Sequence, residues 1–229
     1  MRVDLEPGFV LHTRAYRESS LLVDLLTEHH GRVSVVAKGA RRQSRKKVTV
    51  QPFVPMIFSW MGKSSLKTLV SYEHTGQGVW LTGHRLYSAL YINELLVYVL
   101  KPGESLDELY THYAQLIAEL ASKPLEPQLR AFEFALLSEL GLGIDLIHDA
   151  ENGECVQDNV TYSLVNSLGF VKTSRLSRPT ISINGRLLKQ VAASDWQDPE
   201  VLLAAKHITR IGLSPLLENK TMNSRTLFH

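Results

Sequence analysis

The stretch between residues 29 and 72 contains nine Lys and Arg residues and no Asp or Glu. All 23 acidic residues of the chain lie outside this stretch, where they face only 16 basic residues, so a net charge of +2 conceals a strong polarity. Cationic side chains without nearby carboxylates attract anions, and a run of them suits the repeated charges of a polyphosphate. The chemistry that this stretch predicts is the binding of a polyanion such as a nucleic acid.

The cations are densest in the segment KGARRQSRKKVTV, residues 38–50, which holds six of them. Arg offers phosphate a planar fork of donors, whereas Lys acts as a point charge. Neutralising about five or six phosphates would make log affinity fall with log salt, at roughly −0.7 per phosphate on single strands. Phe53, Phe58, Trp60 and Tyr72 could add base stacking if they are exposed. The alternative interpretation is a solvated charge run beside aromatic residues that belong to a core.

The elements that must position these cations read as short strands. Apolar and β-branched residues predict strands over residues 9–14, 21–27, 33–37, 53–60 and 66–72, separated by glycine- and proline-containing turns. Pro52 and Pro55 suggest an edge or a bulge in the fourth strand. Five such strands predict a small barrel or sandwich, and a five-stranded barrel that binds single-stranded nucleic acid is the OB-fold.

Helical periodicity replaces the strand pattern in the rest of the chain. The predicted helices run from about Gly83 to Lys101, over residues 106–122, from Pro127 to Gly141, and over residues 182–191 and 199–212. Ser105 with Glu108 predicts a capping box for the second helix, and Asp198 before Pro199 predicts an N-cap for the last. The sequence thus predicts an α+β fold, with an OB-fold barrel over residues 1–80 followed by a helical domain over residues 81–229.

Several apparent motifs for other chemistry fail. Gly62-Lys63-Ser64 lacks the glycine that a P-loop needs five positions earlier, where Ile57 stands. His29-His30 lies on a turn without a supporting carboxylate pattern, and Asp145 with His148 has no nucleophile nearby in sequence. We therefore expect no catalytic residue, no bound metal and no cofactor. The N-terminus lacks the apolar core of a signal peptide, and no apolar run approaches ~20 residues, so a cytoplasmic protein is expected.

With these residues in view, the sequence closely resembles the RecO family of bacterial DNA-repair and recombination proteins. The resemblance covers nearly the whole chain, in family order, through the stretches FVLHTRAYRESSLLVDLLTEHHGRVSVVAKGARR, QPF, LKTL, LYINELL, LRAFEFALLSELGLGIDL, LLAAKHITR and NSRTLF. GRVSVVAKGARR and LYINELL are individually specific, and their joint order makes a chance match very improbable.

The resemblance implies an OB-fold joined to a helical domain and a function without enzymatic activity. Such proteins bind single- and double-stranded DNA, anneal complementary strands, and act with RecR to help RecA load onto DNA coated with single-strand-binding protein. The matched motif places Arg32, Lys38, Arg41 and Arg42 on the DNA-binding barrel, and Arg45, Lys46 and Lys47 follow from their charge. We expect a monomer in isolation, located in the cytoplasm at the nucleoid.

Arg130 acquires a role from the same resemblance. Arg130 lies beside Phe134 and Leu137 on the predicted helix. An arginine in this position either anchors an acidic peptide or covers apolar side chains at the surface with its aliphatic stem. The family match implies the first, with Arg130 meeting the carboxylate at the acidic C-terminal tail of single-strand-binding protein.

One feature departs from the family. Many relatives carry four cysteines that hold a structural zinc after the third helix, but residues 149–170 contain only Cys155. We predict a zinc-free hairpin over residues 149–172, with strands at residues 160–164 and 170–172.

Two other functions stay open, an OB-fold nuclease that needs metal and an RNA-binding OB protein.

Overall fold

The computed structural model describes residues 1–41, 49–106, 108–166, 168–176, 181–217 and 220–228. The chain forms two compact units, one comprising Met1–Lys123 with Asn219–His229 and the other Pro124–Glu218. None of the helices in the described parts of the chain has the length and apolar character required to cross a membrane.

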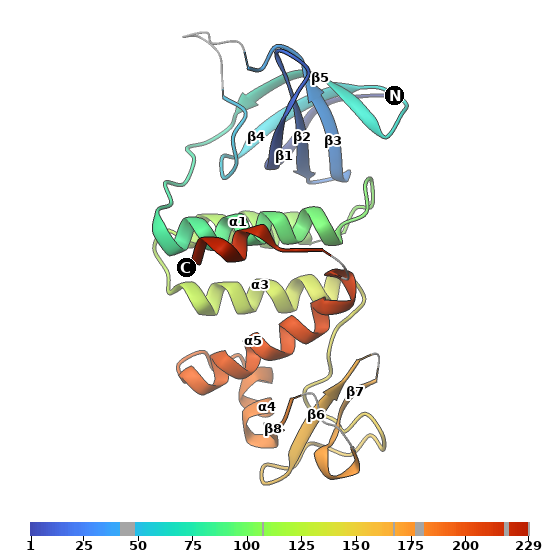
Figure 1. Cartoon of the computed structure of the whole chain (residues 1–229), viewed down its shortest axis with the longest axis vertical. Coiled ribbons are helices and arrows are strands. Elements are labelled where there is room, and N and C mark those ends of the chain that lie inside the picture. Colours follow the sequence, from blue (N-terminus) through green and yellow to red (C-terminus); the bar gives the residue numbers. More distant parts are fainter. Residues whose placement is uncertain (42–48, 107, 167, 177–180, 218–219, 229) are drawn as a thin grey trace. The chain divides into compact units, whose positions relative to one another are not determined.

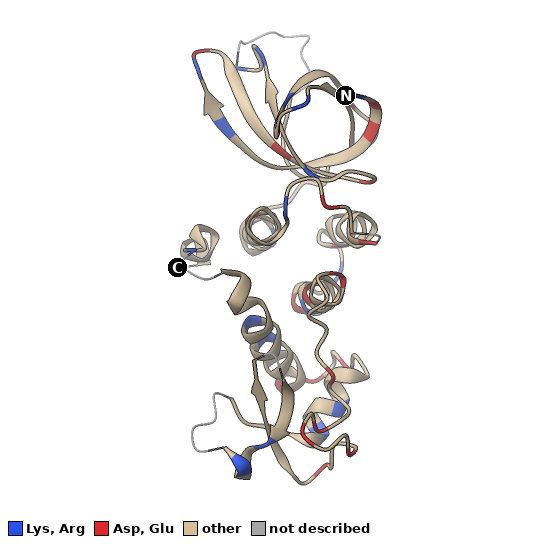
Figure 2. Cartoon of the chain, turned by 90° about the vertical axis from the view of Figure 1, so that its right-hand side faces the viewer, with Lys and Arg blue, Asp and Glu red and all other residues tan. Residues whose placement is uncertain are grey.

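The first unit contains a closed five-stranded barrel with the strand order β1-β2-β3-β5-β4. Its strands are β1 (Arg2–Tyr16), β2 (Ser20–Thr27), β3 (Gly31–Ala37), β4 (Met56–Met61) and β5 (Leu66–His74). β3 and β5 pair in parallel and the other neighbours are antiparallel. Figure 1 shows the barrel from the side, and Figure 2 shows it nearly along its axis as a closed ring. The predicted OB-fold is confirmed.

The barrel core is built by alternation along the strands. Met56, Phe58 and Trp60 share one face of β4 and are at most 1% exposed, packed among the valines and leucines of β2 and β3. Phe53 is also buried, so three of the four aromatics suggested as base-stacking platforms are core residues and that expectation was wrong for them. Trp80, in the segment between β5 and α1, is by contrast 87% exposed.

Two helices and the C-terminal segment complete the first unit: α1 (Gly83–Val99), α2 (Leu109–Glu119) and the 3-10 helix η3 (Asn223–Phe228). Asn93 of α1 is buried, donates to the backbone oxygen of Leu11 at 2.8 Å and accepts from the hydroxyl of Tyr113 at 2.7 Å. Phe9 packs edge-on against Tyr113, with ring centroids 5.1 Å apart. These contacts fix the helices against the barrel wall.

The start of α2 differs from the prediction. The helix begins at Leu109, and Glu108 at the N-cap makes no side-chain capping bond, so Ser105 does not cap it. The segment before it is held by the barrel instead, because the amide of Gly103 donates to the backbone oxygen of Arg32 at 2.8 Å.

The second unit combines helices with a small sheet. Its elements are α3 (Leu125–Glu139), β6 (Thr161–Val165), β7 (Gly169–Lys172), η1 (Thr173–Arg175), β8 (Ile183–Asn184), α4 (Gly185–Ala192), α5 (Pro199–Leu213) and η2 (Ser214–Leu217). The two predicted strands of the hairpin are confirmed by the antiparallel pairing of β6 with β7. The predicted N-cap of α5 is also confirmed, because Asp198 accepts from the amide of Glu200 at 2.8 Å. The helix predicted from residue 182 begins at Gly185, because β8 pairs with β6.

Candidate nucleic-acid interface

Two turns meet at one end of the barrel, which we call the loop end. The turn Arg17-Glu18-Ser19 joins β1 to β2, and residues 38–41 follow β3. The amide of Arg41 donates to the backbone oxygen of Ser19 at 3.0 Å. Its guanidinium donates to the backbone oxygens of Arg17 and Glu18 at 3.3 and 3.4 Å. These bonds fasten the start of the basic segment to the neighbouring turn.

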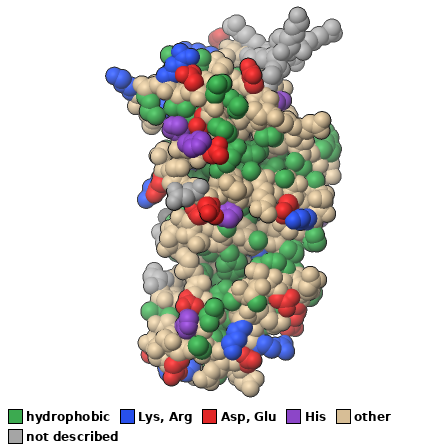
Figure 3. Space-filling model, turned by 180° about the vertical axis from the view of Figure 1, so that it is seen from behind, with side chains coloured by type: hydrophobic (Ala, Val, Ile, Leu, Met, Phe, Trp, Pro, Cys, Tyr) green, Lys and Arg blue, Asp and Glu red, His purple; other side chains and the backbone are tan. Residues whose placement is uncertain are grey.

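In the described part of the chain, the side chains of Arg41 and Arg17 contact neutral backbone oxygens and an aromatic ring, not carboxylates. Arg17, Lys38 and Arg41 are exposed, and Glu18 is the one acidic residue among the described residues of the two turns. Arg41 bonds to neutral backbone oxygens, which satisfy its donors without cancelling its charge. On the face drawn in Figure 3, Lys and Arg side chains gather near the top of the barrel, with Asp and Glu side chains beside some of them.

The predicted contacts divide into three groups. Lys38 and Arg41 lie together at the loop end. Arg42, Arg45, Lys46 and Lys47 lie outside the described residues. Arg32 lies at the opposite end of β3, six residues from Lys38, a separation of about 20 Å along an extended strand.

Arg32 is engaged inside the first unit. Its side chain is 16% exposed and its guanidinium donates to the backbone oxygen of Val97 in α1. Its Nε lies 4.0 Å from a carboxylate oxygen of Asp24. The structure therefore does not bring Arg32 into the exposed cluster of the loop end, because the residue joins the barrel to α1.

Sequence reasoning missed two cations. The first is Arg14, which follows His12 along β1. In the register with β2, Arg14 pairs with Leu22 and His12 pairs with Asp24. These residues line a groove of about 560 Å³ on the outer face of the barrel, bordered by α1. Strand alternation could have identified Arg14 as outward-facing. Arg17 escaped because it precedes the acid-free stretch.

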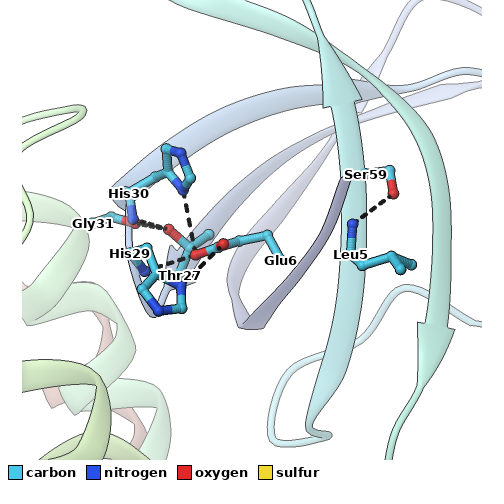
Figure 4. Close-up of polar contacts among 7 residues, drawn as sticks. All are labelled: Leu5, Glu6, Thr27, His29, His30, Gly31 and Ser59. Carbon is cyan, nitrogen blue, oxygen red and sulfur yellow. Dashed lines mark hydrogen bonds and ion pairs between the residues drawn. The ribbon is translucent and has the colours of Figure 1, made fainter. Parts of the chain in front are cut away.

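At the opposite, helix-side end of the barrel, two histidines of the acid-free stretch, His29 and His30, lie beside the carboxylate of Glu6 (Figure 4). Glu6 is 5% exposed and accepts from the amide of His29 at 2.7 Å. One of its oxygens lies 3.2 Å from Nδ1 of His29 and the other lies 3.4 Å from Nδ1 of His30. The ring of His30 meets Trp60 edge-on at 5.4 Å. Among the residues described, no three His, Cys, Asp or Glu side chains form a group that could hold a metal ion.

The turn after these histidines is shaped by a close approach. Gly31 has a φ of +59°, and a Cβ built there would lie 1.9 Å from the backbone oxygen of Glu104. Only glycine fits both conditions. Nearby, burial and, to a smaller extent, the carboxylates of Glu28 and Glu6 together raise the pKa of Tyr110 to about 12. Carboxylates thus accompany the histidines at this end.

Arg130 on α3 is buried in the second unit. Its side chain is 4% exposed, and its guanidinium lies 2.8 Å from the carboxylate of Glu133, which is itself 1% exposed. Glu133 also accepts from the hydroxyl of Thr209 on α5. Nε of Arg130 is buried without a hydrogen-bond partner, and the nearest carboxylate, that of Glu126, is 3.7 Å away. Glu126 lies four residues before Arg130 and Glu133 lies three residues after it, a helical spacing that could have predicted this pairing.

A closed OB-type barrel with an exposed basic end, followed by a mainly helical unit, defines a protein of the nucleic-acid-binding class. Residues 1–77 match the family model described as "Recombination protein O N terminal", and residues 81–225 match "Recombination protein O C terminal". The chain belongs to the RecO family.

Curated relatives match over more than nine tenths of their lengths. The "DNA repair protein RecO" of Haemophilus influenzae (strain 86-028NP) is 44% identical over 230 residues, covering 100% of this chain and 97% of the relative. The protein of the same name from Aliivibrio fischeri (strain MJ11) is 43% identical, with 100% and 96% covered. That of Pasteurella multocida (strain Pm70) is 44% identical, with 96% and 92% covered.

Proposed function

We propose that this protein is a DNA-repair and recombination mediator that binds single- and double-stranded DNA and anneals complementary strands. With RecR, it helps RecA load onto DNA coated with single-strand-binding protein. Membership of the RecO family supports the role in repair and recombination. The observation that supports DNA binding most is the exposed cationic cluster of Lys38, Arg41 and Arg17 at the loop end.

The proposed mechanism of annealing is charge neutralisation. Two DNA strands repel each other through their phosphates, and condensed counter-ions are displaced when Lys and Arg take their place. The loop end offers such cations on a rigid support, because Arg41 is bonded across to the β1–β2 turn. Lowering the repulsion lets complementary bases meet, and no bond needs to be made or broken.

The test of DNA binding is a charge reversal of Arg41, Arg42, Lys46 and Lys47 to Glu, three of which lie outside the described residues. Its matched control is Lys101→Glu at the helix side of the same unit, where the Lys101 side chain is 84% exposed. We expect the fourfold variant to lose DNA binding and annealing with an intact fold, and the control to retain both. Unchanged, salt-insensitive binding by the fourfold variant would refute the proposal.

Recognition of the acidic tail is proposed for the surface around Arg130. Glu126, whose side chain is 44% exposed, lies 3.7 Å from Arg130 and 3.6 Å from Nζ of Lys206. Its carboxylate thus stands between two cations and is not within hydrogen-bonding distance of Arg130. In our proposal, the carboxylate of an incoming tail displaces Glu126 and takes this position between Arg130 and Lys206.

This arrangement predicts opposite effects of two substitutions on the tail peptide. Glu126→Gln removes the competing charge and should tighten binding of the peptide, whereas Lys206→Gln should weaken it. Neither should change binding to naked DNA, and Glu200→Gln on an exposed acid of α5 serves as the control. Weaker peptide binding by Glu126→Gln, or equal losses for peptide and DNA, would argue against a separate tail site.

The remaining partners follow from the proposed role. We propose a monomer in isolation that works in the cytoplasm at the nucleoid and forms a complex with RecR. Sedimentation of the protein alone and mixed with RecR measures both points, and a stable dimer without RecR would contradict the first. The direct assay of function is annealing of complementary strands coated with single-strand-binding protein, with and without that protein's C-terminal tail. Loss of annealing only when the tail is absent is the expected result.

A further inference from the structure

A pocket of about 430 Å³ opens between the two turns of the loop end. Arg17 and Lys38 enter its lining from opposite turns, and Tyr16, Ser19 and Ser20, whose side chains carry hydroxyl groups, are among the other lining residues. Among the described residues that line it, none carries a carboxylate. Two cations with hydroxyl donors and no competing acid form an environment for a phosphate group.

The backbone at this pocket is held in an unusual conformation. Arg17 has a φ of +52°, in the left-handed region that residues with a Cβ rarely adopt. The backbone oxygens of Arg17 and Glu18 accept from the guanidinium of Arg41, and that of Ser19 accepts from the Arg41 amide. Strain that the surroundings maintain in this way is concentrated at binding sites. It aims the Arg17 side chain before any ligand arrives.

The Arg17 side chain is also positioned by an aromatic ring. Its guanidinium carbon lies 5.2 Å from the centroid of Tyr16, within the range of a cation–π contact. A guanidinium held over one face of a ring retains its edge donors for an anion. Tyr16 is half-buried, so its ring supports the arginine from the protein side.

We propose that this pocket binds one internal phosphodiester of a nucleic-acid strand, neutralised jointly by Arg17 and Lys38. The pocket volume lies within the range of about 300–1,000 Å³ that small-molecule sites occupy, so an attached sugar can enter with the phosphate. This inference rests on the proposed DNA binding; it assigns Arg17 and Lys38 to one phosphate and adds Tyr16 and Ser19 to the contact surface. The proposed interface thus includes the β1–β2 turn, which precedes the acid-free stretch in the sequence.

The test measures affinity for a labelled single-stranded oligonucleotide across a salt series. Arg17→Gln keeps the length of the side chain and removes its charge, and Arg17→Lys restores the charge without the fork. The control is Arg2→Gln at the start of β1, an exposed arginine that is paired with Asp4. We expect Arg17→Gln to lose about five- to tenfold in affinity and roughly 0.7 in salt slope, with Arg17→Lys recovering most of the slope.

A second variant tests whether the two cations share one phosphate. Lys38→Gln should produce a similar loss, and the double variant should lose less than the product of the two single losses because both cations hold the same group. Fully multiplicative losses would contradict a shared pocket. The loss of affinity should be equal for 5′-phosphorylated and 5′-hydroxyl oligonucleotides. A loss confined to the phosphorylated oligonucleotide would show that the pocket binds a terminal phosphate and would overturn the assignment to an internal phosphodiester.

The outcomes separate this inference from the proposed function. The pocket assignment would be overturned if Arg17→Gln kept the wild-type affinity and salt slope. The proposed function would stay intact in that case if DNA binding were still lost on charge reversal of Arg41, Arg42, Lys46 and Lys47. Absence of DNA binding by the wild-type protein would overturn the proposed function itself. A lower affinity with an unchanged salt slope would overturn the assignment of the pocket to a phosphate.

Discussion

The two ends of the barrel receive cationic residues from the same acid-free stretch and use them differently. At the loop end, Lys38 and Arg41 are exposed, and Arg41 is bonded only to backbone oxygens in the contacts described. At the helix-side end, Arg32 bonds to Val97, and His29 and His30 meet the buried carboxylate of Glu6. A stretch without acids in sequence is therefore not without acids in space, because β1 and β2 bring Glu6 and Asp24 beside it.

The second unit repeats the helix-side arrangement. Arg130 pairs with the buried Glu133 on its own helix. In the barrel, burial separates cations that hold the fold from cations that remain available to a ligand. Arg130 combines both roles in our account, because its terminal nitrogen pairs with Glu133 while its Nε, which has no hydrogen-bond partner among the described residues, faces the proposed tail site. Each of the following predictions tests that division.

The largest expected effect is on the stability of the second unit. Arg130→Ala leaves the carboxylate of Glu133 buried without its counter-ion, which should lower the free energy of unfolding by about 3–5 kcal/mol. Arg130→Met combined with Glu133→Leu removes both charges and should recover most of that loss. Urea denaturation of the three proteins measures the comparison. Equal stability of wild type and Arg130→Ala would show that the pair is not a structural one.

The contact between β1, α1 and α2 is expected to come next. Tyr113→Phe leaves the side-chain oxygen of buried Asn93 without its donor, and the expected loss is about 1–3 kcal/mol. The substitution should leave the loop end unchanged, so the affinity of the folded protein for DNA should match wild type. A loss of DNA affinity without a loss of stability would contradict the separation of the two ends.

The smallest effect concerns the C-terminal segment on α1. Although burial acts to raise it, the pKa of Glu94 is held below its ordinary value by hydrogen bonds from Ser224 and the amide of Asn223. A carboxyl with a lowered pKa in the folded state stabilises that state above its unfolded pKa of about 4.3 and loses this contribution as pH falls through the folded value. The hydrogen-exchange protection factors of residues 223–228, which correct for the intrinsic pH dependence of amide exchange, should therefore fall as the pH drops through that lowered pKa. Glu94→Gln should remove that pH dependence.

Sequence patterns determined the local elements but not their distant partners. Alternation and turn residues gave the strands of the barrel, and Asp198 with Pro199 gave the start of α5. The burial of Phe58 and Trp60 was also readable, since both share the inward face of β4 with Met56. The predicted capping role of Ser105 failed because Gly103 and Glu104 pack against the barrel, a contact that no local pattern encodes.

The candidate site was predicted only in part for the same reason. Charge counting found Lys38 and Arg41, but the partners of Arg32 come from α1 and β2, and Arg17 reaches the site through the pairing of two turns. Long-range pairing decides which cations are free. Composition within one stretch cannot report it.

The most direct measurement of this division compares Lys38→Gln with Arg32→Gln in two assays, the salt dependence of DNA affinity and the free energy of unfolding. For Lys38→Gln, the salt slope should fall by roughly 0.7, with stability unchanged to within about 0.5 kcal/mol. For Arg32→Gln, the unfolding free energy should fall by about 1.5–3 kcal/mol, because a charged hydrogen bond to Val97 is lost, while the slope stays at its wild-type value. A lowered slope with intact stability in Arg32→Gln would contradict the account.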